Sequence, residues 1–161
     1  MIGLMEVLGK SPINKYLYAS GKLSSFAADG ALILQFFGLN FRIIDVPPAI
    51  SLAALILASI GFMIFIFAML NLGSSMRFGL PTEPTRFKTE GLYSFSRNPM
   101  YLGFFLILFA SIIYTANPVI AVLAVYGIYI HHLIALSEEK FLKERFGQRY
   151  LDYCGKTGRY I

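Results

Sequence analysis

The sequence predicts an all-α integral membrane protein with about four transmembrane helices, a cytosolic loop and a helical C-terminal tail. Hydrophobic residues make up 57% of the 161 residues and charged residues 14%, whereas soluble domains average about 45–50% and about 25%. The apolar residues also gather in runs near the length of about 17–25 residues that crosses a bilayer as a helix. The length suits a single membrane domain over residues 1–161.

The first two candidate spans differ in polarity. Residues 26–44 are mostly apolar but carry polar and charged side chains that include Asp29, Gln35 and Arg42, so full spanning by this segment stays open. An acidic residue within a span is a functional hint by default, although we expect Asp29 to lie at the cytoplasmic boundary. Residues 49–72 form an almost unbroken apolar run, which predicts a complete membrane helix.

The third and fourth segments form a predicted helical hairpin. Residues 99–116 and residues 118–136 are both apolar, and a turn signal of Asn117 followed by Pro118 separates them. Because the connection is short, we expect the two helices to run antiparallel. The start of the third segment and the end of the fourth therefore meet at the same face of the membrane.

Both ends of the chain are expected to lie outside the bilayer. Residues 1–25 lack the continuous apolar core of a signal peptide and suit a segment on the membrane surface, and residues 137–161 are interpreted as a cytosolic tail. The single cysteine, Cys154, excludes an intramolecular disulfide and says little about redox compartment.

The basic residues predict the orientation. With four spans, the N-terminal segment, the loop after residue 72 and the tail share one side, which carries 13 of the 14 lysine and arginine residues. If residues 26–44 do not span, the division becomes 10 against 4, and the loop and tail still share the richer side. The positive-inside rule makes that side cytoplasmic. The net charge of +5 then needs no nucleic-acid partner.

A polar triplet, Arg97-Asn98-Pro99, stands at the cytoplasmic start of the third segment. Asn is favoured at a helix N-cap and Pro at the first helical position, so one interpretation is a capped helix whose arginine reaches lipid headgroups. The functional interpretation uses the same geometry. The free N–H groups and the positive dipole end of a helix start favour a carboxylate or phosphate, and the arginine adds a fixed charge.

Two adjacent carboxylates, Glu138 and Glu139, follow the fourth segment. The hairpin brings them to the same membrane face as Arg97 and Asn98. At the end of a membrane helix they oppose the helix dipole, whereas in a helix that continues into the tail they belong to a solvated surface. The functional interpretation is a cation receptor beside an anion receptor, a combination that fits a zwitterionic amino-acid group.

His131 and His132 precede the glutamates by one to two helical turns. A spacing of seven residues places His131 near the face of Glu138 and His132 near the face of Glu139. The chain has no further histidine, so we expect no metal site. Packing or hydrogen bonding within the bundle, contact with a cofactor and proton transfer all stay open for this pair.

Two motifs resemble those of a known enzyme family. Residues 91–103, GLYSFSRNPMYLG, resemble the pattern G-x-Y…R-H-P-x-Y-x-G, and residues 138–161, EEKFLKERFGQRYLDYCGKTGRYI, resemble E-E-x-x-L…F-G-x-x-Y-x-x-Y…R. Together they are similar to the integral-membrane methyltransferases grouped with isoprenylcysteine carboxyl methyltransferase and the phospholipid methyltransferases. The resemblance covers residues 91–161, which is under half of the chain.

The resemblance implies that S-adenosylmethionine binds at the cytosolic membrane face and donates its methyl group to an amphipathic or lipid-like acceptor, such as a prenylcysteine-type carboxylate. The implied cofactor-binding residues are Tyr93, Arg97, Asn98, Pro99, Tyr101, Gly103, His131, Glu138, Glu139, Tyr150 and Tyr153. The tail around Phe146, Gly147 and Arg159 is expected to fold back as a cover. Glu139 and His132 are the candidate catalytic residues, because an acceptor that must lose a proton needs a base.

One position departs from the pattern, since Asn98 stands where the commoner motif has His. Asn keeps hydrogen-bonding capacity but does not titrate near neutral pH. Contact with the cofactor is therefore expected to survive at this position, and proton transfer is not.

Two other functions stay open. An NADPH-dependent membrane reductase is an alternative, because the steroid-reductase C-terminal region is similar at R-x-P-x-Y-x-G and F-G-x-x-Y and needs no Gly-rich dinucleotide fingerprint. A non-enzymatic membrane scaffold would bind anionic lipid through the basic tail, but it leaves the paired motifs unexplained. The expected partners are the lipid bilayer and a small-molecule acceptor, and the oligomeric state is left open.

Overall fold

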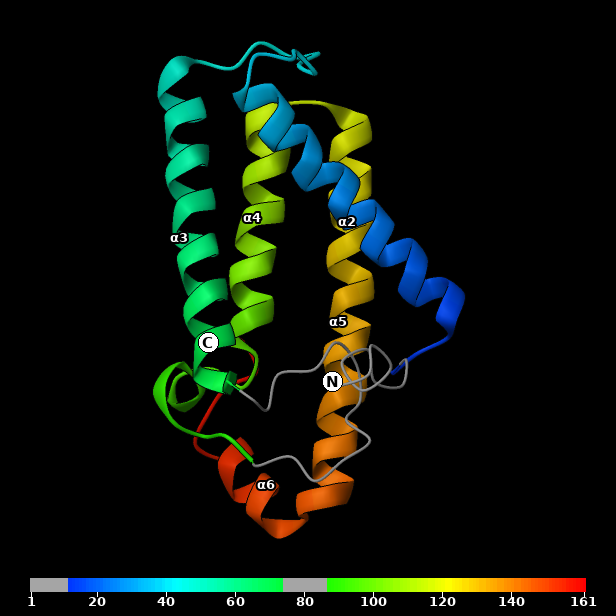
Figure 1. Ribbon diagram of the computed structural model, residues 1–161, viewed down its shortest axis with the longest axis vertical. Helices are drawn as coiled ribbons and strands as arrows, with labels where there is room; N and C mark the ends of the chain where they lie inside the picture. Colours follow the sequence, from blue (N-terminus) through cyan, green and yellow to red (C-terminus); the bar gives the residue numbers. More distant parts are fainter. Residues whose placement is uncertain (1–11, 74–86) are drawn as a thin grey trace, which may run out of the picture.

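A computed structural model describes residues 12–73 and 87–161, and every regular element within them is a helix (Figure 1). The elements are α2 Lys15–Phe36, α3 Pro48–Leu72, the short 3₁₀ helix η2 Gly91–Ser94, α4 Pro99–Thr115, α5 Pro118–Phe146 and α6 Gln148–Cys154. The all-α prediction is therefore confirmed. Residues 1–11 of the surface segment predicted over residues 1–25 lie outside the described residues.

Helix α2 runs from Lys15 to Phe36, so it begins and ends earlier than the span predicted over residues 26–44. Asn14 caps the helix start with its side chain, which accepts a backbone hydrogen bond of 2.9 Å. Ser24, in the early turns, donates its hydroxyl to the carbonyl oxygen of Leu123 on α5 at 2.8 Å. The prediction missed the first turns of α2 because their polar side chains are untypical of a membrane helix. In the structure, polar side chains such as Ser24 bind partners inside the bundle. Gly38, with a φ of 105°, follows the helix and directs the chain away from it.

Asp29, which was expected at the cytoplasmic boundary, is the fifteenth of the 22 residues of α2 and lies away from both ends of the helix. Its carboxylate accepts a hydrogen bond of 3.1 Å from the hydroxyl of Ser111. Ser111 stands twelve residues after Pro99, the first residue of α4, which is about 18 Å along a helix. The bundle accommodates this acidic side chain because a buried hydroxyl satisfies it.

Two of the described helices, α3 and α5, are long and apolar enough to cross a membrane, whereas α4 has 17 residues and is shorter. The helix predicted over residues 49–72 is confirmed as Pro48–Leu72. Its exposed large side chains include Ile56, Ile60, Met63, Phe67 and Leu70. A bilayer accepts such a surface because lipid tails are as apolar as the side chains themselves.

Helices α4 and α5 form the predicted antiparallel hairpin. Ala116 takes the left-handed conformation after α4, with a φ of 44°. The side chain of Asn117 then accepts a hydrogen bond of 2.9 Å from the backbone N–H of Val119 and starts α5. The short polar connection thus reverses the chain without leaving the next helix start unsatisfied.

Helix α5 runs without a break from Pro118 to Phe146, so the predicted helical tail begins as a continuation of the fourth predicted span, and the membrane boundary near residue 136 stays a prediction. The added turns are rich in Glu, Lys and Arg, which are good helix formers. Lys143 and Arg145 in the last turn also favour the negative end of the helix dipole. The two glutamates therefore lie inside a helix, where their side chains have fixed directions.

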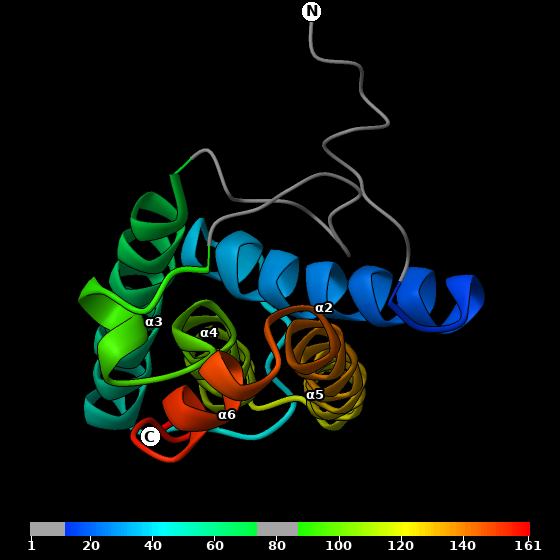
Figure 2. The same cartoon turned by 90° about the horizontal axis from the view of Figure 1, so that it is seen from below.

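The elements that carry the sequence motifs gather at one end of the bundle (Figure 1, Figure 2). Helix α6, η2 and the C-terminal tail lie beneath the start of α4, while the α2–α3 connection and the α4–α5 turn lie at the opposite end. Helix α3 packs against α4 at Gly61 and Gly103, which lack side chains and let the two backbones approach closely. The buried core comprises Ala28, Ala31, Leu108, Ile120 and Ala124.

Candidate active site

The candidate site begins where the C-terminal tail folds back onto the start of α4. An isolated parallel bridge pairs Ser96 with Gly158. The backbone N–H of Arg97 donates to the Gly158 carbonyl at 2.9 Å, and that of Asn98 donates to the Arg159 carbonyl at 3.1 Å. The tail thus supplies acceptors at a helix start, where backbone donors otherwise lack partners. The predicted return of the tail is confirmed, and its role as a cover over a cofactor stays a prediction.

Three polar side chains meet at Glu139, and we call the four residues Arg97, Asn98, Glu139 and Arg159 the Glu139 cluster. Asn98 Nδ2 donates to Glu139 Oε1 at 2.8 Å. Arg159 donates through Nε and Nη2 to the two carboxylate oxygens at 3.1 Å each. Arg97 Nη1 lies 3.6 Å from the same carboxylate. A bidentate arginine together with an amide donor fixes the carboxylate in place.

Asn98 holds the N-cap position of α4, but its side chain does not cap the helix. Its amide nitrogen lies 2.8 Å from Glu139 Oε1 and 3.3 Å from the Arg159 carbonyl oxygen. The capping interpretation is therefore wrong for this side chain, because a buried carboxylate binds its NH₂ group more strongly than the local backbone binds its oxygen. Ser96 Oγ instead accepts the backbone N–H of Asn98 at 3.1 Å.

Arg97 stands between Glu139 and the tail. Its Nη1 donates to Cys154 Sγ at 2.6 Å. Its Nε is buried and has no hydrogen-bond partner among the described residues. A buried donor without an acceptor costs free energy, so this nitrogen marks a position that an anion would satisfy.

Glu138 has different partners from Glu139, and we call Tyr101 and Glu138 the Glu138 pair. The Tyr101 hydroxyl donates to Glu138 Oε2 at 3.0 Å, and Lys22 of α2 attracts the same carboxylate. Glu138 therefore turns toward α2 and α4, while Glu139 turns toward the start of α4 and the tail. The two adjacent carboxylates therefore have different side-chain partners.

The two histidines also differ in their contacts. His131 is buried, and its Nδ1 lies 2.8 Å from the carbonyl oxygen of Gly127, one turn earlier on α5. Its ring centroid lies 4.7 Å from that of Phe104. His132 Nδ1 lies 2.8 Å from the Tyr160 hydroxyl oxygen, so the tail reaches α5 here as well as at Glu139.

Aromatic rings hold the tail against the segment before α4. The Tyr153 hydroxyl donates to the Tyr93 carbonyl, and the Phe87 ring centroid lies 5.3 Å from that of Tyr153 and 5.7 Å from that of Tyr150. Burial raises the pKa of Tyr153 to about 12 and raises the pKa values of Tyr93 and Tyr150 further. All three hydroxyls therefore stay protonated at neutral pH.

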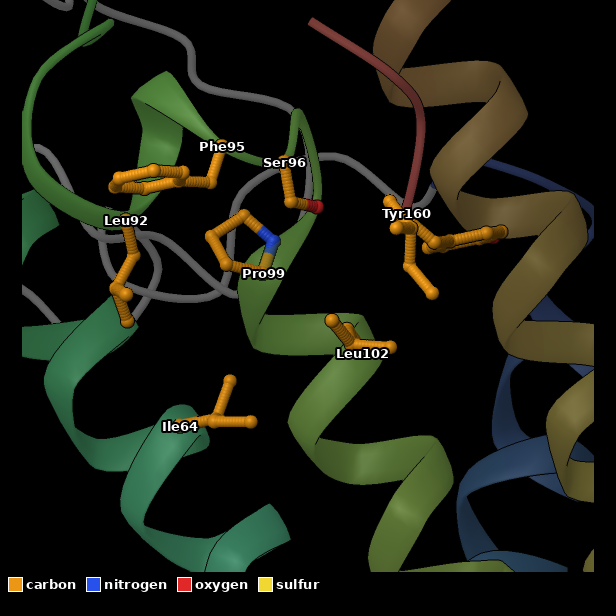
Figure 3. A pocket seen from close by; sticks show the side chains of 8 residues that line it. Ile64, Leu92, Phe95, Ser96, Pro99, Leu102 and Tyr160 are labelled. Atoms are coloured by element: carbon orange, nitrogen blue, oxygen red, sulfur yellow. The ribbon is translucent and has the colours of Figure 1, made fainter.

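An apolar cavity of about 210 Å³ lies beside the Glu139 cluster (Figure 3). Its lining residues are Ile64, Leu92, Phe95, Ser96, Pro99, Leu102, Tyr160 and Ile161. Figure 3 shows Tyr160 coming from the tail with its ring turned toward α5, while Pro99 and Leu102 come from α4. The cavity therefore borders α3, the segment before α4, α4 itself and the tail.

The structure brings some of the predicted site residues together and separates others. Arg97, Asn98 and Glu139 meet directly, and Tyr101 meets Glu138. Gly103 faces α3 across the close backbone contact. Tyr93, Tyr150 and Tyr153 lie in or beside the aromatic contacts of the tail, Pro99 lines the cavity, and His131 binds within its own helix. Cofactor contact by any of these residues stays a prediction.

Tyr160 is a site residue that the sequence analysis missed. It lines the cavity and also contacts His132. The sequence carries no periodic signal for it, because its position depends on the return of the tail. The arginine that precedes it belongs to the tail motif and offered the nearest signal.

Comparison with known proteins agrees with the motifs. A sequence model of the family described as phospholipid methyltransferase matches residues 49–149, which is more than half of the chain. The match spans α3, the segment before α4, the α4–α5 hairpin and the start of α6. Arg97, Asn98 and both glutamates therefore lie within it.

Two characterised proteins are similar to part of the chain. Methanethiol S-methyltransferase 1 of Bradyrhizobium diazoefficiens is 44% identical over 83 residues, which cover 52% of this chain and 28% of that protein. Protein-S-isoprenylcysteine O-methyltransferase of Saccharomyces cerevisiae is 35% identical over 69 residues, which cover 42% of this chain and 29% of that protein. Each match thus spans under a third of the relative's length.

Proposed function

Because the chain belongs to the phospholipid methyltransferase family, we propose that it is an S-adenosylmethionine-dependent methyltransferase that acts at the cytosolic membrane face on an amphipathic or lipid-like acceptor. One observation carries the proposal. Donors from the start of α4 and carboxylates from α5 lie at one end of the hairpin, beside an apolar cavity. That combination suits a polar cofactor and an apolar acceptor at one boundary.

The residues present fit the methionine end of the cofactor. Arg97 Nε is buried and lacks an acceptor among the described residues, so it is available to the carboxylate. Glu138 accepts a hydrogen bond from Tyr101 and keeps lone pairs for the ammonium group, since an ionised carboxylate offers about four acceptor positions. Glu139 is less available, because Asn98 and Arg159 already occupy its oxygens.

The bound cofactor would supply a methyl group on a positively charged sulfur, whose leaving group needs no further activation. The protein's contribution is then to hold the acceptor in line with that methyl group and to exclude water. Glu139, fixed by Asn98 and Arg159, is a positioning residue in this arrangement rather than a base. Its lone pairs already face donors, whereas a base needs one directed at the acceptor.

For the methyl acceptor we propose a chemical class and not a particular molecule. One similar protein is named for methanethiol and the other for isoprenylcysteine, which are a small thiol and a lipid-attached carboxylate. Both have an apolar part that the cavity of about 210 Å³ suits. The basic residues that follow the two glutamates in the sequence, such as Lys143, Arg145 and Arg149, support the cytosolic location.

Calorimetry on the detergent-purified protein tests the proposal. The protein is titrated with S-adenosylmethionine, with its demethylated product and, separately, with NADPH. We expect the methionine cofactor to bind, and Arg97→Gln and Glu138→Gln to weaken it by about tenfold or more, as loss of one charged contact does. Glu144→Gln is the matched control, because Glu144 is exposed on the same helix and its carboxylate lies 4.0 Å from the exposed Lys140 ammonium.

The three ligands separate the alternatives. Binding of NADPH instead of the methionine cofactor would support a membrane reductase. A folded sample that binds neither would favour a scaffold. Equal weakening by the Glu144 control would show that the effect of Glu138→Gln is not specific to the site.

A further inference from the structure

We propose that Cys154 is a site of reversible oxidation by hydroperoxides, at which a sulfenic acid forms and is bound by Arg97 and Tyr150. The proposal goes beyond methyl transfer, and only its effect on cofactor binding rests on the proposed function. It starts from two buried donors beside one sulfur atom. Arg97 Nε and the Tyr150 hydroxyl have no hydrogen-bond partner among the described residues, and both side chains lie next to Cys154.

The sulfur of Cys154 faces a guanidinium. Arg97 Nη1 donates to Cys154 Sγ at 2.6 Å. Glu139 also attracts Arg97, but Arg159 donates to both of its oxygens at 3.1 Å, whereas Arg97 Nη1 stays 3.6 Å away. The positive charge of Arg97 is therefore left largely to the sulfur. A cationic neighbour and partial exposure are the surroundings in which cysteines react, and Cys154 is half-buried.

Tyr150 brings a second donor to the same sulfur. It precedes Cys154 by four residues on α6, so the two side chains lie on one face of that helix. Tyr150 is 3% exposed, and its ring packs against Phe87. Burial, Glu139 and the Cys154 sulfur all raise the pKa of its hydroxyl. The hydroxyl thus keeps its proton near the sulfur, but it forms no hydrogen bond of normal geometry among the described residues.

One oxygen atom on the sulfur would give both donors an acceptor. A buried donor without a partner costs free energy, and the oxygen of a sulfenic acid lies one covalent bond from Sγ, between the two side chains. The 161 residues contain no second cysteine, so no thiol within them converts the sulfenic acid to a disulfide. Its stability then depends on the hydrogen bonds that Arg97 and Tyr150 donate.

The oxidation step balances with a hydroperoxide as the oxidant. The thiol sulfur bonds to one peroxide oxygen, and the O–O bond breaks with its electron pair passing to the leaving oxygen. That oxygen takes the thiol proton and departs as water or, from an alkyl hydroperoxide, as an alcohol. The sulfur loses two electrons and the peroxide gains them. A dithiol reverses the step, since it releases the sulfenic oxygen as water and becomes a disulfide itself.

Oxidation competes with the methionine cofactor for Arg97. The proposed function assigns Arg97 Nε to the carboxylate of the cofactor, and a sulfenic acid at Cys154 offers the same nitrogen an acceptor within the protein. We therefore expect oxidation to weaken binding of the cofactor. Bound cofactor should in turn slow oxidation, because it engages a donor that the sulfenic acid needs.

The first test needs neither cofactor nor activity. The detergent-purified protein is treated with hydrogen peroxide, and dimedone traps any sulfenic acid as an adduct that peptide mass spectrometry locates. We expect the adduct on Cys154, and dithiothreitol added before dimedone should prevent it. Cys154→Ser is the control for the six methionines, which peroxide also oxidises.

The second test removes one donor. Tyr150→Phe loses the hydroxyl and keeps the ring against Phe87. We expect the adduct to form about tenfold more slowly, the scale of one lost hydrogen bond to a charged group. A tail that had merely loosened would expose the thiol and react faster, so the direction of the change separates the two causes. Tyr129→Phe, an exposed tyrosine on α5, is the matched control and should leave the rate unchanged.

The third test measures the effect on the cofactor. After removal of the peroxide, calorimetry should show S-adenosylmethionine binding about tenfold more weakly to the oxidised protein, as loss of one charged contact does. Dithiothreitol should restore the affinity. Peroxide should not change the affinity of Cys154→Ser, since that variant has no thiol to oxidise.

Folded protein that gives no adduct on Cys154 would overturn the proposal, and so would a rate that Tyr150→Phe leaves unchanged or increases. Full cofactor affinity in the oxidised protein would refute the competition for Arg97. Protein that forms the adduct but binds no cofactor even when reduced would contradict the proposed function and would still support the oxidation site.

Discussion

Glu138 and Glu139 are neighbours in the chain but occupy different environments. Glu139 is held by Asn98, by Nε and Nη2 of Arg159 and by nearby Arg97. Among the described residues, Glu138 accepts its side-chain hydrogen bond from Tyr101. Because successive residues on a helix point about 100° apart, one carboxylate joins α5 to the tail and the other faces α2 and α4. Multiple charged donors suit a structural role, and spare acceptor capacity suits a ligand.

The largest expected effect comes from Glu139→Gln, which breaks the Glu139 cluster. The neutral amide leaves Arg159 and Arg97 without their counter-charge and presents an NH₂ group to donors. We expect the free energy of unfolding to fall by about 3 kcal/mol, near the lower bound for breaking a buried ion pair, because Arg159 is partly exposed. Denaturant titration of the detergent-solubilised protein measures it. A loss no larger than that of Glu144→Gln would contradict the structural role.

Asn98→Ala should have the second largest effect on the cluster. It removes the 2.8 Å donor to Glu139 and the 3.3 Å contact to the Arg159 carbonyl. We expect a loss of about 2 kcal/mol, typical of a hydrogen bond to a charged group. Because the same side chain does not cap α4, helix content measured by circular dichroism should stay unchanged. Fraying of the helix would show that Asn98 acts as a cap after all.

Whether a part of this arrangement could be predicted from the sequence depends on whether its interactions are local. The α4–α5 hairpin was predictable, because Asn117 and Pro118 signal a turn between apolar runs, and so was the gathering of Arg97 with Glu139 at one end. The start of α2 was missed because Ser24 finds its acceptor on α5, ninety-nine residues away. Burial of a polar residue by a distant partner leaves no periodic signal in the local sequence.

The tail shows the same limit. Its return was expected from the family resemblance, but the two contacts that matter at its end, Arg159 with Glu139 and Tyr160 with His132, depend on the path of residues 155–158. The roles of the two glutamates could not be separated from the sequence either. Their side chains diverge only because α5 continues as a helix to Phe146, and the sequence analysis left that continuation open.

Tyr101→Phe tests the Glu138 pair, as the two substitutions above test the Glu139 cluster. It removes the hydroxyl that donates to Glu138 at 3.0 Å and keeps the ring against Phe105. We expect a loss of about 1.5 kcal/mol in the free energy of unfolding, smaller than for Asn98→Ala because one contact is lost instead of two. The same denaturant titration measures it. A loss above that of Glu139→Gln would mean that the Glu138 pair is the structural centre.

Glu138→Gln should have the smallest effect on stability and a large effect on function. The amide oxygen can still accept the Tyr101 hydroxyl, so the hydrogen bond survives the substitution. We expect the free energy of unfolding to fall by under about 1 kcal/mol, because the Tyr101 hydrogen bond is kept and only the attraction from Lys22 is lost, while the methionine cofactor binds about tenfold or more weakly. This single substitution would then weaken cofactor binding with little change in stability. Glu139→Gln, in contrast, should lose both, because a displaced Arg97 cannot hold the cofactor carboxylate. If Glu138→Gln destabilised the protein and left binding intact, the two glutamates would exchange roles, and the ammonium site would have to be sought at Glu139.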